Sequence, residues 1–389
     1  MQSVDVLIRG AGVVGQCLAL GLARSGLRVA LRDTSPAATT RLAANLKAST
    51  EAGTEASTKV GDDVRAYALN AASVGLLREL KVWDSVTPSA ITPVYEMRVR
   101  GDKAPASLEF TAWQQGVAAL AWIVDAQALH EALDSAIRNA AHVARPATDV
   151  QAGLTALCEG KDSATRGALG VHVERVDFAQ TAVVARLSAS RDHQNVAHQW
   201  FRSPDILALL PRGGPQAQAS YALVWSCSTS RALTLLALAP AEFEGQLAQA
   251  CGGAAGELLL CSERKAWPLT QALAHPWCGP GWVLLGDAAH VIHPLAGQGL
   301  NLGLADVAAL TRVIAQREPW RSLGDARLLR RYARQRAAPT WAMGQLTDGL
   351  LQLFSHPAPA MRELRNRGLT LVNRIPPVKR WLNARATHS

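Results

Sequence analysis

The sequence contains no apolar run close to the 18 or so residues that a membrane-spanning helix requires. Charged residues are also scarce, at 18%, whereas apolar residues make up 49% of the 389 positions. This balance is typical of a chain that buries a sizeable core, and it excludes a disordered, collagen-like or coiled-coil protein. No cleavable signal precedes the first apolar segment, so we expect a soluble, cytoplasmic protein.

Cysteine is used sparingly, in a pattern that favours neither a disulfide framework nor a metal centre. None of the six cysteines belongs to a C-x-x-C pair, and none has a histidine at the spacing of a zinc ligand. Isolated thiols of this kind suit a reducing cytoplasm. The 11 tryptophans are dispersed without interleaved basic residues, so we expect core and pocket roles for them and no nucleic-acid partner.

The N-terminal residues follow the order strand, glycine turn, helix and strand. Residues 3–8 are predicted to form a buried strand, residues 16–25 have the period of a helix, and residues 27–31 form a second apolar strand. The second strand closes on Asp33, about 20 residues after the glycines. This order predicts a dinucleotide-binding unit in which Asp33 accepts a hydrogen bond from a ribose hydroxyl.

Three glycines of the turn have separate tasks in such a unit. Gly10 allows the tight turn, Gly12 lets a pyrophosphate approach the backbone, and Gly15 lets the helix and strand pack closely. The helix N-terminus then faces the phosphates. The alternative is a tight turn between a strand and a helix without a nucleotide.

A second glycine loop follows about 290 residues after the first. Residues 282–285 are predicted to form a buried strand that turns at Gly286-Asp287, and residues 294–299 (PLAGQG) open a helix over 300–310. A helix N-terminus favours an anion, so the two loops could hold a long dinucleotide at both ends, the adenosine diphosphate at the first and a redox ring at the second. Asp287 is expected to bind the ribityl or pyrophosphate part, and a helix N-cap is the alternative for it.

The segments between the loops are predicted more coarsely. Helices are expected from residue 70 to 83 and over 129–140, and strands around 95–100, 106–110, 171–188 and 206–210. Residues 220–226 and 232–238 could pair as neighbouring antiparallel strands. Residues 34–62 are rich in Ala, Thr and Ser and are expected to form a connection or peripheral insertion.

Positive charge is concentrated at the C-terminal end. Residues 312–389 contain 15 Lys and Arg against 4 Asp and Glu, a balance of +11, so the other residues together carry about −2 of the total of +9. Such a module can meet an anionic membrane surface, an acidic partner or nucleic acid, and an ordinary solvated helical face is the alternative.

The second loop also carries a resemblance to a known family. The run Gly286-Asp287-Ala288-Ala289-His290, together with residues 293–301 (HPLAGQGLN), resembles the flavin-binding signature of class A FAD-dependent aromatic hydroxylases. It is most similar to the ubiquinone-biosynthesis hydroxylase group that includes UbiH, UbiF and VisC. Other segments agree with that group: 63–69 (DVRAYAL), 122–125 (WIVD), 180–184 (QTAVV), 208–211 (ALLP), 330–332 (RRY), 364–369 (LRNRGL) and 372–377 (VNRIPP).

The resemblance implies an α/β fold in two interleaved parts. A glutathione-reductase-like, Rossmann-type FAD domain is expected over 1–72, 125–168 and 270–310, and a β-sheet substrate domain over 73–124 and 169–269. A basic helical segment is expected over 311–389. The family's reaction is hydroxylation of a polyprenyl phenol in ubiquinone biosynthesis, in which NADH or NADPH reduces FAD and O2 forms a flavin C4a-hydroperoxide.

The family motifs also imply which residues meet the cofactor. Arg65, Pro294 and Gly297 are expected next to the reacting flavin. The FAD-binding residues are expected to be Gly10, Gly12, Gly15, Asp33, Arg65, Gln127, Glu159, Gly160, Gly286, Asp287, Pro294, Ala296, Gly297, Gln298, Gly299, Leu300 and Asn301. His290 and His293 are expected to pack near the cofactor rather than bind a metal. The expected partners are a lipophilic phenol, O2, the inner face of the plasma membrane and other ubiquinone-biosynthesis proteins.

Two features depart from the family pattern. Glu159-Gly160 stands where the family usually has Asp-Gly, and Gln127 where it usually has Arg. The interval between residues 140 and 158 is also too short for the small β-meander that the family commonly has there. These departures leave open a non-catalytic family member that acts as a scaffold in a quinone-biosynthesis complex. A hydroxylase of another aromatic substrate is a further alternative.

Overall fold

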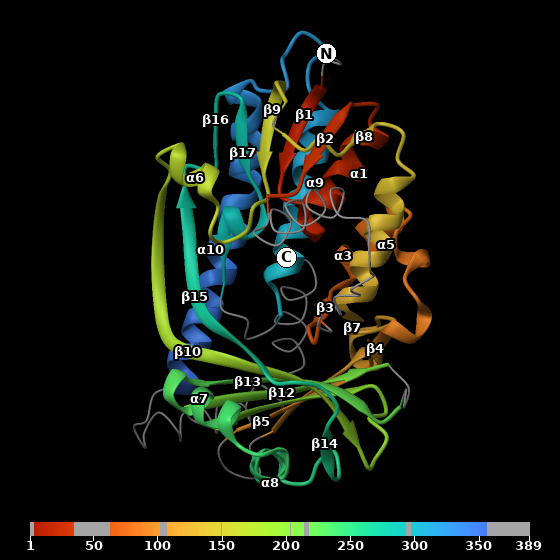
Figure 1. Cartoon of the computed structure of the whole chain (residues 1–389), viewed down its shortest axis with the longest axis vertical. Helices are drawn as coiled ribbons and strands as arrows, with labels where there is room; N and C mark the ends of the chain where they lie inside the picture. Colours follow the sequence, from red (N-terminus) through yellow and green to blue (C-terminus); the bar gives the residue numbers. More distant parts are fainter. Residues whose placement is uncertain are drawn as a thin grey trace, which may run out of the picture.

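The structure is a computed structural model that describes residues 4–34, 63–101, 107–148, 150–202, 204–213, 218–292 and 297–355. It is a mixed α/β fold in which two sheets lie at opposite ends of the long axis and a small third sheet lies between them (Figure 1). Among the helices described, none combines the length and apolar character needed to cross a bilayer. Residues 35–62, expected to form a connection, lie outside the described residues.

The six-stranded sheet at the upper end of Figure 1 has the strand order β16-β17-β9-β1-β2-β8. We call it the nucleotide-type sheet, because it contains the predicted dinucleotide-binding strands. Its strands pair in parallel except for β16 on β17. They are β1 (Val4–Arg9), β2 (Val29–Arg32), β8 (Val143–Ala144), β9 (Ala152–Leu157), β16 (Cys278–Gly279) and β17 (Trp282–Leu284). The three consecutive apolar residues Val6, Leu7 and Ile8 of β1 are all buried, as expected for a strand that is covered on both faces.

The large sheet at the lower end has the order β18-β15-β10-β13-β12-β11-β5-β6, with β14 paired to β10. Its strands are β5 (Glu96–Arg100), β6 (Ser107–Thr111), β10 (His172–Ala189), β11 (Val196–Arg202), β12 (Asp205–Arg212), β13 (Ser220–Ser228), β14 (Leu258–Leu260), β15 (Lys265–His275) and β18 (His290–Val291). The small sheet joins β3 (Ala66–Leu69), β7 (Ala121–Asp125) and β4 (Ile91–Val94). The chain passes between the sheets several times, so neither large sheet is built from one continuous segment.

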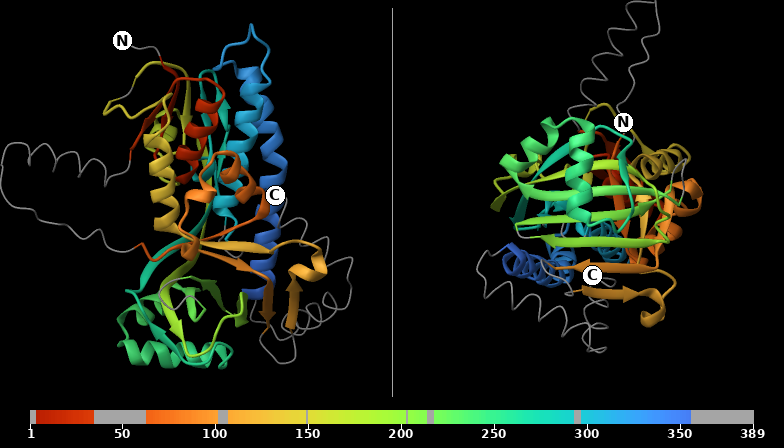
Figure 2. Two further views of the ribbon diagram at one scale, coloured as in Figure 1. Left: turned by 90° about the vertical axis from the view of Figure 1, so that its right-hand side faces the viewer. Right: turned by 90° about the horizontal axis from the view of Figure 1, so that it is seen from below.

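Helices pack on both large sheets (Figure 2). They are α1 (Val13–Arg24), α3 (Ala71–Glu79), α4 (Ala112–Gln115), α5 (Ala126–Arg138), α6 (Ala164–Ala168), α7 (Thr229–Ala237), α8 (Pro240–Cys251), α9 (Gly299–Ala315) and α10 (Ala326–Ser355). Short 3-10 turns are η1 (Trp83–Ser85), η2 (Pro88–Ala90) and η3 (Gly286–Ala288).

The expectation of a strand over 232–238 is wrong, because residues 232–237 lie in α7 and Leu238 is its C-cap. Ser228 caps the helix by accepting a hydrogen bond from the Arg231 N–H at 3.3 Å. Ala232 and Leu235 are buried three residues apart, which is a helical spacing. The strand prediction read the apolar residues as a continuous run, and such a run does not distinguish a short strand from a helix.

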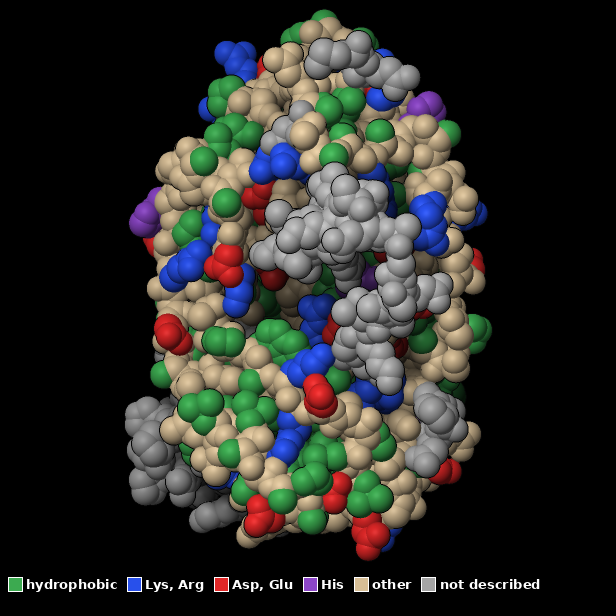
Figure 3. Space-filling view, in the orientation of Figure 1, with side chains coloured by type: hydrophobic (Ala, Val, Ile, Leu, Met, Phe, Trp, Pro, Cys, Tyr) green, Lys and Arg blue, Asp and Glu red, His purple; other side chains and the backbone are tan. Residues whose placement is uncertain are grey.

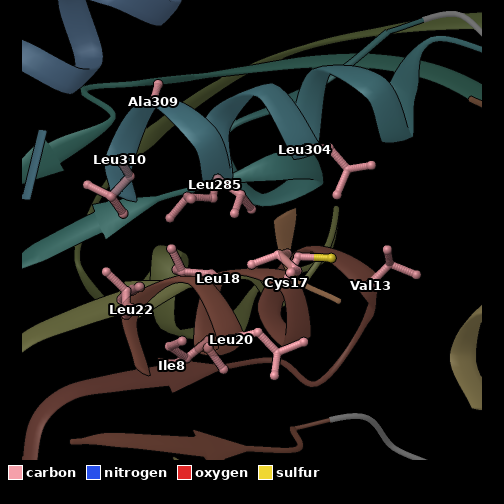
Figure 4. Packing of buried hydrophobic residues seen from close by; sticks show 14 of the residues in the cluster. Ile8, Val13, Cys17, Leu18, Leu20, Leu22, Leu285, Leu304, Ala309 and Leu310 are labelled. Atoms are coloured by element: carbon pink, nitrogen blue, oxygen red, sulfur yellow. The ribbon is translucent and has the colours of Figure 1, made fainter. Parts of the chain in front are cut away.

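The main core forms where α1 packs against α9. Helix α1 is buried over most of its length, from Val13 to Leu22. Figure 4 shows Leu18 of α1 pointing toward Leu285 and toward the side of α9 that carries Leu310, and all three are fully buried. This packing brings the two glycine loops, one at the start of each helix, into the same region of the molecule.

Candidate functional site

The first glycine turn leaves the N-terminus of α1 open. Gly12 is the N-cap, no side chain caps the helix, and a Cβ built on Gly12 meets nothing within 4 Å. Gly10 has φ +107°, and a Cβ there would lie 2.2 Å from the carbonyl oxygen of Cys158. A Cβ on Gly15 would lie 1.9 Å from the Gly10 carbonyl oxygen. The uncapped N–H groups of α1 therefore face a space that a phosphate can enter.

The second glycine loop presents a second open helix end. Helix α9 begins after Gln298, which is buried but makes no side-chain cap, and a Cβ on Gly299 would again meet nothing within 4 Å. Gly297 has φ +62°, and a Cβ there would lie 3.3 Å from the Cβ of Ala68 on β3. The half-buried Leu300 packs on the main core. The predicted residues Pro294 and Ala296 lie outside the described residues, as does His293.

Val14 joins the two loops. A Cβ on Gly303 of α9 would lie 2.7 Å from Cγ2 of Val14, and one on Gly286 would lie 3.2 Å from the same atom. Val14 stands two residues after Gly12, so the first helix N-terminus lies against the turn that carries Asp287. Loops far apart in the sequence thus form a single site, as expected for one long dinucleotide.

Asn301 fixes β3 and α3 against the start of α9. Its Oδ1 accepts hydrogen bonds from the Asn70 N–H at 3.0 Å and from the Ser73 hydroxyl at 2.8 Å. Its Nδ2 donates to the carbonyl of Ala68 at 2.9 Å and to Gln298 at 3.2 Å. With both ends of its amide engaged, Asn301 positions the loop through its side chain and leaves its backbone at the open helix end.

Asp287 is an acidic side chain with room around it. Its neighbours in η3 are buried, whereas Asp287 itself is exposed, and its carboxylate makes no hydrogen bond or ion pair with another described residue. The alternative that it caps a helix therefore does not hold. The surrounding protein raises the pKa of Asp287 by desolvation, although His290 and Lys161 act to lower it. Burial is the main cause of the raised pKa of Tyr67 on β3, and Asp287 adds a smaller upward effect.

The surface is hollowed between the two large sheets on the face that Figure 3 shows, and charged side chains are visible around the hollow. Arg65, at the start of β3, is half exposed and is held by Asp63 through Nη2 at 2.7 Å and Nε at 2.9 Å. This ion pair raises the pKa of Arg65, so its charge is permanent. Asp33 follows β2 directly, beside the carbonyl of Arg32 that accepts from the Gly10 N–H at 2.8 Å.

Glu159 and Gln127 are engaged within the protein. The Glu159 carboxylate accepts from Nε of Arg9 at 2.8 Å, from the Ser163 hydroxyl at 2.6 Å and from the Thr165 hydroxyl and N–H at 2.8 and 3.2 Å. These four bonds use its acceptor positions, so Glu159 shapes the turn at Gly160, which has φ +78°. Burial alone would raise the pKa of Glu159, but these partners hold it below its usual value. Gln127 is exposed and donates to Glu131 at 2.9 Å, one turn along α5.

Asp306 on α9, which the sequence did not single out, holds the Gly286 turn in place. It is fully buried and accepts from the Gly286 N–H at 2.9 Å, while Nε2 of His290 and Nε of Arg336 each lie 2.7 Å from its oxygens. Desolvation acts to raise the pKa of Asp306, but His290 and Arg336 bring it below the usual value. His290 therefore packs behind the turn, against Asp306 of α9.

Arg166, also missed, ties the Glu159 turn to the Gly286 turn. Its guanidinium is buried and donates to the carbonyl of Ala288 at 2.8 Å and to that of Lys161 at 2.7 Å.

Between Arg138 and Ala152 the described residues form only the two-residue strand β8, so a meander is absent from them. In the described part of the chain, no cluster of His, Cys, Asp and Glu is arranged to hold a metal ion.

Comparison with known proteins agrees with this geometry. A family model described as FAD binding domain matches residues 3–347. The 3-demethoxyubiquinol 3-hydroxylase of Escherichia coli is 30% identical, over 97% of this chain and 97% of its own length. Ubiquinone hydroxylase UbiL of Rhodospirillum rubrum is 29% identical, over 97% of this chain and 87% of its own. The crystal structure of Klebsiella pneumoniae HpxO with FAD has the same fold, with a TM-score of 0.70 at 16% identity over 98% of this chain and 99% of that one.

Proposed function

This chain belongs to the FAD-binding-domain family and, within it, to the class A flavin hydroxylases of ubiquinone biosynthesis, and we propose that its substrate is a lipophilic phenol that it hydroxylates on the ring. The names of two relatives give ubiquinone or a demethoxyubiquinol as the compound that those proteins hydroxylate. One observation carries the proposal for this chain: two uncapped helix N-termini lie close together at Val14, beside the Asp287 carboxylate, which has no partner among the described residues.

The residues of the site fit FAD. The open end of α1 at Gly12 suits the pyrophosphate, and Asp33 suits the adenosine ribose. Asp287 suits a hydroxyl donor on the chain between pyrophosphate and ring. When bound, FAD supplies the redox chemistry, taking electrons from NADH or NADPH and activating O2.

The protein's own contribution is electrostatic and steric. The N–H groups at the start of α9, which no described side chain caps, would stabilise negative charge on the redox ring. Arg65, which directly precedes β3, is kept cationic by its ion pair with Asp63. The four bonds of Asn301 and the buried contacts of Asp306 hold these groups rigidly, so little reorganisation is needed during the reaction.

The region beside the second loop is apolar, which suits an aromatic substrate. Ala68, against which Gly297 packs, belongs to a cluster with Ile123 and Val94 of the small sheet and with Ala197 and Leu210 of the large sheet. Val94, Ile123 and Ala197 are buried in this cluster, so only its partly buried members, such as Ala68 and Leu210, can contact a ring. We expect the phenol next to the partly buried side of this cluster.

Purified protein tests the proposal directly. We expect yellow protein with flavin absorbance that oxidises NADH or NADPH faster when a phenol is added and releases the hydroxylated phenol. Complementation of strains blocked at each ring hydroxylation, with mass spectrometry of the intermediates, identifies the ring carbon. NAD(P)H oxidation that yields only hydrogen peroxide with every phenol would contradict the proposal.

The same preparation tests the alternative of a non-catalytic scaffold. Gly12 and Gly299 keep open spaces next to uncapped helix ends, a feature that a protein without a bound dinucleotide does not need. Colourless protein that cannot be reconstituted with FAD would favour the scaffold. Contacts with other ubiquinone-biosynthesis proteins stay a prediction, for which co-purification with the labelled chain is the measurement.

A further inference from the structure

One face of α10 carries a row of exposed arginines. Arg327, Arg330 and Arg334 follow one another at spacings of three and four residues, which place side chains on one side of a helix. Trp341, seven positions after Arg334, continues this side and is 61% exposed. We call these four residues the basic stripe. At about 1.5 Å per residue the stripe is about 21 Å long, enough to contact several lipid headgroups.

The opposite side of α10 fixes the direction in which the stripe points. Leu328, Leu329 and Tyr332 are fully buried, and the Tyr332 hydroxyl donates to the carbonyl of Leu284 at 2.9 Å. Arg336 lies on this inner side, paired with Asp306. Figure 2 shows α10 running along the outside of the molecule. The helix is thus anchored from within, and the basic stripe faces outward.

The charges of the stripe are not balanced by the protein around them. The nearby carboxylates Glu318 and Asp325 are paired with Arg321, and Glu318 also with Arg331. Within the described residues none of the three stripe arginines makes an ion pair, and Arg330 and Arg334 donate only to backbone carbonyls one turn earlier, at 3.1 and 3.3 Å. The sequence beyond residue 355 adds seven basic residues and one acidic residue, so it supplies little compensating charge.

We propose that the basic stripe docks the protein on an anionic membrane surface. Arginines along one side of a helix attract acidic headgroups, and an exposed indole inserts at the level of the headgroups. A second indole, Trp320, is 76% exposed six residues before the helix begins. The choice of a membrane over an acidic protein rests on the lipophilic substrate proposed above, because a phenol with a long apolar tail lies in the bilayer.

Flotation of the full-length holoprotein tests the docking surface. Vesicles of phosphatidylcholine with phosphatidylglycerol are compared with vesicles of phosphatidylcholine alone, at low and high salt. The wild-type protein is expected to float only with the anionic vesicles and to be released by salt. The triple variant Arg327→Gln, Arg330→Gln, Arg334→Gln is expected to lower the partition coefficient about a hundredfold. Trp341→Ala is expected to lower it by a smaller factor.

A matched triple variant controls for net charge. Arg24, Arg138 and Arg191 are exposed on other parts of the molecule and make no ion pair with a described residue. Their replacement by Gln changes the net charge equally and is expected to preserve vesicle binding. Equal loss in both triple variants, or wild-type protein that does not bind anionic vesicles, overturns the proposal. An acidic protein partner would give the latter result.

Docking and catalysis are separated by a second measurement. Each variant is assayed for flavin absorbance and for hydroxylation of a short, water-soluble phenol, which needs no membrane. Lost vesicle binding with unchanged turnover of the soluble phenol supports the stripe as a docking surface. If the wild-type protein hydroxylates no phenol but still binds vesicles through the stripe, the proposed function fails and the docking surface stands.

Discussion

The buried carboxylate of Asp306 links three parts of the chain that are distant in sequence. Its partners are the Gly286 N–H, the His290 ring and the Arg336 guanidinium of α10. Buried charges are tolerated only when they are paired and hydrogen-bonded, and here both carboxylate oxygens are engaged. The C-terminal helix therefore contributes directly to the turn that presents Asp287.

Replacing Arg336 tests how much its ion pair with Asp306 contributes to the stability of the protein. We expect Arg336→Met to lower the free energy of unfolding by about 3 to 5 kcal/mol, because it leaves a buried carboxylate without its permanent cation. FAD should also bind more weakly, since the Gly286 turn loses part of its anchor. Urea unfolding and a flavin titration measure the two effects.

Two further variants of α10 make this result specific. Arg336→Lys keeps a cation but loses the planar guanidinium, and it should recover part of the stability and of the FAD affinity. Arg334→Met, on the exposed side of the same helix, should change stability by no more than about 0.5 kcal/mol. Unchanged stability and FAD affinity in Arg336→Met would show that the pair does not hold the turn.

At the scale of the element, a substitution at the N-terminus of α1 can separate an effect on folding from an effect on FAD binding. A Cβ on Gly12 has no neighbour within 4 Å, and its φ of −72° suits any residue. Gly12→Ala should therefore leave the apoprotein as stable as before, or slightly more stable. FAD affinity should fall at least tenfold, because the added methyl occupies the space predicted for the pyrophosphate.

Gly15→Ala is the matched comparison three residues further along the same helix. Its Cβ would lie 1.9 Å from the Gly10 carbonyl oxygen, so it should destabilise even the apoprotein. Thermal unfolding of the apoproteins and flavin fluorescence titrations distinguish the two variants. Tight FAD binding by Gly12→Ala would mean that the pyrophosphate does not approach this turn.

The glycine loops could be predicted from the sequence because the spacing of their glycines is itself a recognisable pattern. The close approach at Gly15 is local, since its neighbour is the Gly10 carbonyl oxygen, whereas the close approach of Gly10 to the Cys158 carbonyl oxygen is visible only in the folded chain. Asp306 and Arg166 could not be predicted in the same way. Arg166 bonds to a carbonyl 122 residues away, and Arg336 reaches Asp306 from 30 residues away, so only the folded chain reveals their partners. Helix α7 was missed because its apolar run has no period that excludes a strand.

At the scale of the whole molecule, the two ends are expected to respond to acid over different pH ranges. The pKa of Asp306 and that of Glu159 are lowered in the folded protein, so the stability that these carboxylates contribute is present above their unfolded values near 4. That stability is lost only as the pH falls below about 4 and through the folded pKa values. The nucleotide-type end should therefore tolerate mild acid.

The large sheet contains a histidine, His198, that affects stability at a higher pH than these two carboxylates do. His198 on β11 is 5% exposed, and its ring stacks on Trp200 with centroids 5.4 Å apart. Burial, with smaller effects from Arg100 and Arg98, lowers its pKa from 6.5 to about 4, while Glu96 acts in the opposite direction. Between these two values the unfolded chain binds a proton that the folded chain does not, so stability falls as the pH decreases.

Replacing His198 should therefore flatten the pH dependence of stability in mild acid. The wild-type protein is expected to lose about 3 kcal/mol between pH 6.5 and 4 through this one group, the product of its pKa shift and 1.36 kcal/mol per unit. His198→Phe keeps a ring for Trp200 to stack on and removes the titration, so most of this slope should disappear. The same slope is measured in His172→Phe, in which the replaced histidine is exposed. Urea unfolding at a series of pH values measures it, and an unaltered slope in His198→Phe would assign the acid sensitivity to another group.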